Sequence, residues 1–380
     1  MLFLTNKLLK PGMILAKDIT LYNTSNFNTM LLTKGQVLNN AYIKKIKYHN
    51  VEGAYIECEA FSDISIKPYL SDRLKTKSLT QINDVYCEFK MSSGKLNAKS
   101  IKQLSSIVDN LVIELLNKDD LSYNVIDFKN YDTYTFQHCL NVASLSISTG
   151  ISMGLSESHL RDLGMAGLLH DIGKMLIPIE ILNKPDKLTD EEFEVIKKHP
   201  EYAVNQLKNL VSNDVLRSIE GHHEKLDGTG YPHNNKADNI HNYAKILAVC
   251  DVYDALTSDR PYRKPSFPNE VIEYIMGCSD THFDYEILKH FIKIIVAYPI
   301  GSFVKLSDTR LAVVVKNYTE NIMRPIIRII NSDGTVGEDI DLLNDLRYMN
   351  ITIVDMGYDY ENSGIDGILK STYMNKVNAC

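Results

Sequence analysis

The stretch Leu-Leu-His-Asp-Ile-Gly-Lys at residues 168–174 carries two side chains that could share a metal, His170 and Asp171. A neutral imidazole nitrogen and a carboxylate oxygen suit a first-row divalent metal such as iron, manganese or zinc. Because the carboxylate has two oxygens, Asp171 could also bridge two ions. Lys174 would place a cation beside any anion on the metal. Taken alone, the pair would be interpreted as the charged end of a helix.

More histidines and another aspartate recur in matching contexts along the middle of the chain. Each alone would be read as a structural residue, but His222 and His223 are adjacent and are followed by Glu224. The full set of candidate ligands is His138, His170, Asp171, His199, His222, His223 and Asp251. Seven such groups on several helices of one bundle indicate a two-metal site. Two metals about 3.5–4 Å apart can hold a bridging hydroxide and clamp a phosphodiester for in-line attack, so we expect phosphate-ester hydrolysis without a protein nucleophile.

The elements that must position these groups are helices, because apolar residues recur at helical spacing from about residue 130 to residue 297. Ser156 can cap the helix that leads into His170. Thr189 and Glu192 have the spacing of a capping box, and the next helix can begin with Pro200 in its first turn. Asp214 can cap the helix that ends near residues 221–223. Further helices are predicted at residues 134–148, 243–258, 269–276 and 284–297.

The ends of the chain have a different pattern and predict small β-rich parts. Near the start, we expect strands at residues 14–19, 31–32 and 53–56 and a short helix at residues 39–48. Near the end, strands are predicted at residues 302–306, 311–315, 326–330 and 351–354. The fold class is therefore mainly α, a helical bundle with a β-rich module before it and a β appendage after it.

Four parts follow from this pattern. They are a β-rich module at residues 1–60, a linker and helix at 61–124, the helical domain at 125–297, and a β appendage with a loose tail at 298–380. The apolar face of residues 101–115 could pair with a second copy in a homodimer or pack on its own domain, and we favour the second.

The composition narrows the classes of partner. Of the 380 residues, 44% are hydrophobic and 23% charged, and the net charge is −7. This acidic balance argues against a general binder of polymeric nucleic acid or membrane surfaces. No apolar run approaches the ~20 residues of a membrane span, and we see no secretory leader. The six cysteines are scattered without a CxxC pair, which predicts reduced thiols and a cytoplasmic location.

The order of the ligands resembles the metal-dependent phosphohydrolases of the HD superfamily, with His138, then His170-Asp171, then Asp251. Longer motifs are similar to the HD-GYP family in particular. They are His-Asp-Ile-Gly-Lys at 170–174, His-Pro at 199–200, His-His-Glu-Lys-Leu-Asp-Gly-Thr-Gly-Tyr-Pro at 222–232, Asp-Val-Tyr-Asp-Ala-Leu-Thr at 251–257 and Arg-Pro-Tyr-Arg at 260–263. The resemblance covers residues 125–297, and it implies an all-α domain that hydrolyses the bacterial second messenger cyclic di-GMP.

The resemblance also implies roles for individual residues. One metal, iron or manganese, would be bound by His138, His170, Asp171 and Asp251. Asp171 would bridge to a second metal held by His199, His222 and His223. The substrate phosphate would be held by Lys174, Arg260 and Arg263, and Tyr231 would lie near a guanine or a phosphate. The catalytic residues would be His170, Asp171 and Lys174.

Two positions depart from the family pattern, and two alternatives stay open. Tyr134 stands where some members carry a Glu that adds a third metal. This favours two metals and the linear product pGpG, with cleavage to GMP left open. Lys225 stands where an Arg is common.

The first alternative is a module that senses cyclic di-GMP or docks a partner with little turnover, because the β-rich flanks carry no visible chemistry. The second is a hydrolase of other nucleotides, which the Gly-Tyr-Pro loop disfavours.

Overall fold

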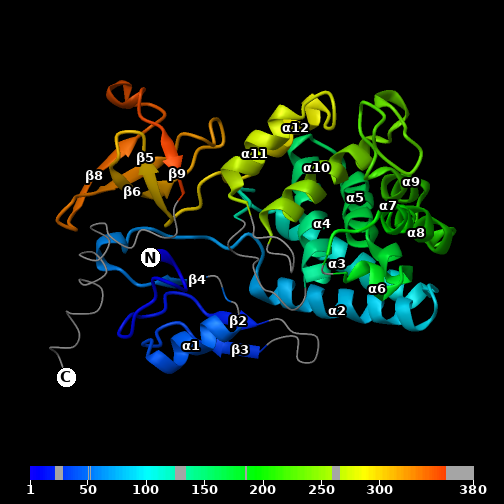
Figure 1. Ribbon diagram of the computed structural model, residues 1–380, viewed down its shortest axis with the longest axis horizontal. Coiled ribbons are helices and arrows are strands. Elements are labelled where there is room, and N and C mark those ends of the chain that lie inside the picture. The colour runs from blue at the N-terminus through cyan, green and yellow to red at the C-terminus, as the bar shows by residue number, and fades with distance from the viewer. Residues whose placement is uncertain are drawn as a thin grey trace.

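Helices α4 (Tyr134–Ser152) and α5 (Glu157–Leu169) pack closely together within a helical body, and the β-rich ends of the chain lie beside that body (Figure 1). The computed structural model describes residues 1–21, 29–49, 51, 53–124, 134–184, 186–258 and 266–356. The predicted fold class, mainly α with small β-rich ends, is confirmed.

The helical body is assembled from helices that bury their apolar faces against one another. Besides α4 and α5 it contains α2 (Asp72–Met91), α3 (Ala98–Leu116), α6 (Ile179–Leu182), α7 (Asp190–Ile196), α8 (His199–Leu207), α9 (Asn213–Gly221), α10 (Asn242–Thr257), α11 (Pro268–Gly277) and α12 (Tyr285–Lys293), with the 3-10 helix η3 (Ile172–Leu176) between α5 and α6. A Cβ atom at Gly167 would lie 2.5 Å from the Cα of Ala143, so α4 and α5 can approach this closely only because residue 167 is glycine.

Most of the predicted helix starts are confirmed. Thr189 and Glu192 form the capping box of α7, and Pro200 lies in the first turn of α8. The prediction that Asp214 caps α9 was wrong, because the hydroxyl of Ser212 accepts the capping hydrogen bond from the backbone N–H of Val215. Helix α12 also ends at Lys293, four residues before the predicted boundary.

Within residues 61–124, the part up to about residue 95 was expected to be a linker with weak helix, and this was wrong, because residues 72–91 form the long helix α2. The sequence does not show a clear apolar face because three polar residues, Lys75, Ser78 and Asn83, are buried on the same face as the apolar residues. Helix α3 buries Leu104, Val108, Leu111 and Leu115 and contacts α2, α4 and α5. The apolar face of α3 therefore packs within its own chain, as we favoured, and a homodimer stays a prediction.

The N-terminal part contains two antiparallel strand pairs and one helix. Strand β1 (Leu2–Thr5) pairs with β4 (Gly53–Ile56), and β2 (Ile19–Leu21) pairs with β3 (Thr29–Leu32). Helix α1 (Asn40–Tyr48) was predicted within a residue of its start. The strand predicted at residues 14–19 was largely wrong, since Ile14 and Leu15 form only isolated bridges, and β1 was not anticipated.

The C-terminal part is a five-stranded antiparallel sheet in the order β8-β7-β6-β5-β9. Its strands are β5 (Phe303–Leu306), β6 (Leu311–Lys316), β7 (Ile326–Ile330), β8 (Val336–Asp341) and β9 (Ile353–Asp355). The sequence did not reveal β8, an acidic edge strand. The loose tail predicted at residues 359–380 lies outside the described residues.

The two β-rich parts touch each other, as Figure 1 shows. The backbone N–H of Phe3 donates to the carbonyl of Gly301 at 3.1 Å.

Among the helices that the structure describes, none has both the length and the apolar character needed to cross a membrane.

Candidate metal centre

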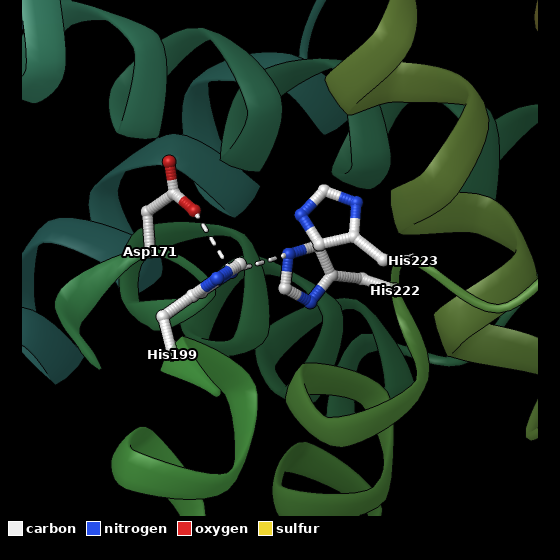
Figure 2. Close-up of side chains that lie close together, drawn as sticks. All are labelled: Asp171, His199, His222 and His223. Carbon is white, nitrogen blue, oxygen red and sulfur yellow. Dashed lines mark hydrogen bonds and ion pairs between the residues drawn. The ribbon is translucent and has the colours of Figure 1, made fainter. Parts of the chain in front are cut away.

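All seven predicted ligands come together inside the helical body. They are supplied by α4 (His138), by the junction of α5 and η3 (His170 and Asp171), by the first residue of α8 (His199), by the two residues after α9 (His222 and His223) and by α10 (Asp251). Figure 2 shows four of them, Asp171, His199, His222 and His223, gathered close together. One ligand atom from each of these four lies within 4.8 Å of the others, and the same holds for His138, His170 and Asp171.

Three of the histidines are oriented in the same way, each by a nearby backbone carbonyl. The Nδ1–H of His170, His199 and His222 donates to the carbonyl three residues earlier, at 2.8, 2.9 and 2.6 Å respectively. A carbonyl can only accept a hydrogen bond, so in the neutral ring this contact assigns the proton to Nδ1. The Nε2 lone pair of each ring is therefore directed into the shared site.

His138 is oriented by a carboxylate instead. Its Nδ1 lies 2.7 Å from Oδ2 of Asp254, and the other oxygen of Asp254 accepts from the side-chain amide of Asn141 at 2.8 Å. The hydroxyl of Tyr123 reaches the same oxygen at 3.4 Å. A carboxylate behind a histidine fixes its tautomer and makes the ring a better metal ligand.

The arrangement of these atoms fits bound cations. The Nε2 atoms of His138 and His170 are 3.3 Å apart, and those of His199 and His222 are 3.4 Å apart. His199 and His222 are both neutral with their Nδ1 protons already used, so this pair would bring two lone pairs together unless a cation lies between them. In addition, the buried Oδ1 of Asp171 accepts no hydrogen bond from any described residue. Buried groups of this kind need a partner, and a divalent metal would supply one.

The pKa values favour the protonation states that bind metal. Burial lowers the pKa of His222 to about 4, and it also lowers the pKa values of His170, His199 and His223. Burial would raise the pKa of Asp171, but Lys174 and the neighbouring histidines hold it well below its usual range. These imidazoles are therefore neutral and this carboxyl is ionised near neutral pH, as metal binding requires.

His138 behaves differently from the other histidines. Burial would lower its pKa, but hydrogen bonds to Asp251 and Asp254 raise the pKa to about 9. The Nε2 atom of His138 lies 3.0 Å from Oδ1 of Asp251. Asp251 and Asp254 thus stabilise a positive charge at His138. A metal ion at Nε2 could take the place of the proton that gives the ring this charge.

Of the predicted substrate residues, two lie at the site and two cannot be placed. The Nζ atom of Lys174 donates to Oδ2 of Asp171 at 2.7 Å. The ring of Tyr231 packs against the ring of His223 with the centroids 4.7 Å apart. Arg260 and Arg263 lie outside the described residues.

The loop that carries Tyr231 is held by a buried acid that we had not assigned a role. The carboxylate of Glu224 accepts the backbone N–H groups of His233 at 2.7 Å and Asn235 at 3.0 Å. A Cβ atom at Gly230 would lie 2.5 Å from both the Cα of Glu224 and the carbonyl oxygen of His223. The loop therefore folds directly onto the His222-His223 pair.

Asp254 and Asn141 were also missed. A signal for both was present in the sequence, since Asp254 follows Asp251 by three residues and Asn141 follows His138 by three. On a helix that spacing places each residue on the same face as a candidate ligand.

Known proteins resemble this chain over the part that carries the candidate site. The family described as HD domain matches residues 120–287. Cyclic di-GMP phosphodiesterase PA4108 of Pseudomonas aeruginosa is 38% identical over 230 residues, 60% of this chain and 55% of the relative. Cyclic di-GMP phosphodiesterase PdeB of Borreliella burgdorferi is 34% identical over 205 residues, 53% of this chain and 54% of the relative.

A third relative carries a different substrate in its name. The 3'3'-cGAMP-specific phosphodiesterase 1 of Vibrio cholerae is 38% identical over 162 residues, 42% of this chain and 37% of the relative. The chain spans about half the length of the first two relatives and less of the third. The HD-domain match at residues 120–287, which contains all the motifs, and these relatives support the predicted resemblance to the HD-GYP family of HD-domain proteins.

Proposed function

We propose that this chain is a metal-dependent phosphodiesterase that opens cyclic di-GMP to linear pGpG. Two relatives that match more than half of the chain are named cyclic di-GMP phosphodiesterases. The full ligand set and the Gly230-Tyr231-Pro232 loop support the same activity here, and they argue against a module that only senses or docks.

The observation that carries the proposal is the position of Asp171 between two groups of ligands. Its Oδ2 atom lies 3.6 Å from Nε2 of His170 and 3.8 Å from Nε2 of His138. Its Oδ1 atom lies 3.4 Å from Nε2 of His199, on the other side. We infer that Asp171 would help to hold two metals, the first together with His138, His170 and Asp251 and the second together with His199, His222 and His223.

The chemistry would then be divided between the metals and the chain. Bound iron or manganese would supply Lewis acidity and lower the pKa of a water molecule for attack on phosphorus. Lys174, which already faces Asp171, would hold the negatively charged phosphate, and Arg260 and Arg263 are proposed to assist it. Tyr231 would shape the substrate side of the second metal site. No side chain has to act as the nucleophile.

Turnover by protein loaded with each metal tests the proposal. The chain would be purified without air, loaded with iron or manganese, analysed for metal content, and incubated with cyclic di-GMP. We expect pGpG as the product. A parallel assay with 3'3'-cGAMP would show whether the chain shares the substrate named for the third relative. The proposal would be abandoned if fully loaded protein left cyclic di-GMP intact with both metals.

A further inference from the structure

Helices α6 and α7 follow η3 and precede His199, yet neither helix has a fully buried residue. They are joined by an ion pair between Lys184 and Glu192 at 2.7 Å. Phe193 on α7 is 42% exposed, which leaves a large apolar ring open to solvent beside the metal centre. An exposed ring next to a candidate catalytic site is a potential surface for a flat ligand group.

A series of aromatic contacts connects Phe193 to the ligands. Tyr231 lies against His223, and the rings of Tyr231 and Phe193 meet edge to face with centroids 6.3 Å apart. Phe193 is therefore one ring beyond Tyr231 from the candidate second metal site. A nucleotide whose phosphate sits on the metals extends its base away from them, so this is a position where a base could lie.

Two charged groups, one on α7 and one directly after it, lie beside the exposed ring. The Nζ atom of Lys197 is 4.9 Å from the centroid of Phe193 and 6.0 Å from that of Tyr231. The same Nζ atom is 2.6 Å from a carboxylate oxygen of Glu194. An ammonium has three donors, so Lys197 can keep this ion pair and still donate to a ligand. Phe193 thus has a hydrogen-bond donor and an acceptor next to it.

We propose that Phe193, Glu194 and Lys197 form a binding subsite for one guanine base of the substrate. Phe193 would stack on the base. Lys197 would donate to guanine O6, which is an acceptor. Glu194 would accept hydrogen bonds from the N1–H and amino group of guanine. Adenine presents an amino donor in place of O6, so it would meet Lys197 unfavourably, and the subsite selects guanine over adenine. This inference rests on the proposed function.

The ion pair between Glu194 and Lys197 would add little to the stability of the fold, since most ion pairs on a protein surface contribute little. Because this pair lies beside the exposed ring of Phe193, it can instead contribute to ligand binding. The subsite also differs in kind from the metal centre, because it recognises a base and supplies no ligand to either metal.

Substitutions at Phe193 test the stacking. Phe193→Ala should weaken binding of cyclic di-GMP to metal-loaded protein by roughly tenfold or more, measured by calorimetry, and raise KM with little change in kcat. Phe193→Tyr should restore binding, and Phe193→Leu should not. The matched control is Ile179→Ala, which removes an exposed apolar side chain from α6. Metal content should stay constant throughout.

Substitutions at the charged pair test the choice of base. Glu194→Gln combined with Lys197→Gln should reduce the preference for cyclic di-GMP over cyclic di-AMP several-fold, with 3'3'-cGAMP intermediate. Lys187→Gln, at an exposed lysine before α7, is the control. The inference is overturned if Phe193→Ala binds cyclic di-GMP like the original chain, if the double variant keeps its preference, or if the original chain binds no cyclic dinucleotide. Absence of turnover with binding that depends on Phe193 would instead refute the proposed hydrolysis and uphold the subsite.

Discussion

His138 and Asp254 are 116 residues apart in the chain, yet Nδ1 of the histidine lies 2.7 Å from Oδ2 of the aspartate in the interior of the helical body. Both side chains are almost fully buried. Asp254 is in turn held by Asn141 and Tyr123, so the orientation of one candidate ligand depends on α4, α10 and the segment before α4 together.

Asp254→Asn should lower metal affinity while the helices remain folded. The amide cannot hold the imidazole as strongly as a carboxylate, and loss of such a partner typically costs 10–100-fold in metal affinity or activity. Metal content after dialysis against a graded chelator series would measure the effect, and circular dichroism would report the fold. Asp109→Asn, at an exposed acid paired with Arg161, is the control and should change neither value. Unchanged metal affinity in Asp254→Asn would show that His138 does not need this carboxylate.

Asp171→Ala should cost more metal than removal of a ligand to either proposed metal singly. A bridging carboxylate offsets the repulsion between two dications, and its loss raises the electrostatic cost of holding both ions in one site. We expect this variant to lose most of its metal and all measurable hydrolysis. His223→Ala should lose mainly the second metal. Plasma emission spectroscopy would give the stoichiometry. Near-normal metal content and activity in Asp171→Ala would contradict the two-metal assignment.

Gly230→Ala should disturb the site without unfolding the chain. The added methyl group would collide with backbone atoms of His223, Glu224 and Lys225, and backbone atoms cannot rotate away as a side chain can. The loop and His223 would therefore shift, which should reduce occupancy of the second metal. Gly277→Ala is the matched control, because a Cβ there meets nothing within 4 Å. Full metal occupancy in Gly230→Ala would show that the loop does not position His223.

Arg328→Gln should loosen the contact between the two β-rich parts and leave the metal centre intact. The guanidinium forms ion pairs with Asp63 at 2.7 Å and with Asp339 at 2.6 Å, and it holds the pKa of Asp63 below its usual value. Both acids are largely exposed, so the loss in the free energy of unfolding should be only about 1 kcal/mol. Faster proteolysis of the N-terminal part would report the loosened contact between the two β-rich parts. Arg347→Gln, at a 74% exposed arginine, should have no such effect.

The sequence was informative wherever the determining interactions are local. The capping box of α7 joins two residues three positions apart, and the carbonyls that orient His170, His199 and His222 each lie three residues away in the chain. Helical periodicity and ligand chemistry were therefore enough to predict most helices of the body and the seven candidate ligands, and the longer motifs supplied the resemblance to the family. The domain boundaries, the metal identity and the cytoplasmic location stay predictions.

Tertiary structure decided what depends on contacts between distant segments. Helix α2 buries polar residues on its packed face, so its burial could not be read from its own pattern. Strand β8 is acidic and becomes a strand by pairing with β7. The partner of His138 and the use of Glu224 as a clamp for the loop likewise appear only when separate segments meet. Local propensity is expressed within a few residues, whereas burial and long-range hydrogen bonds exist only after the chain has folded.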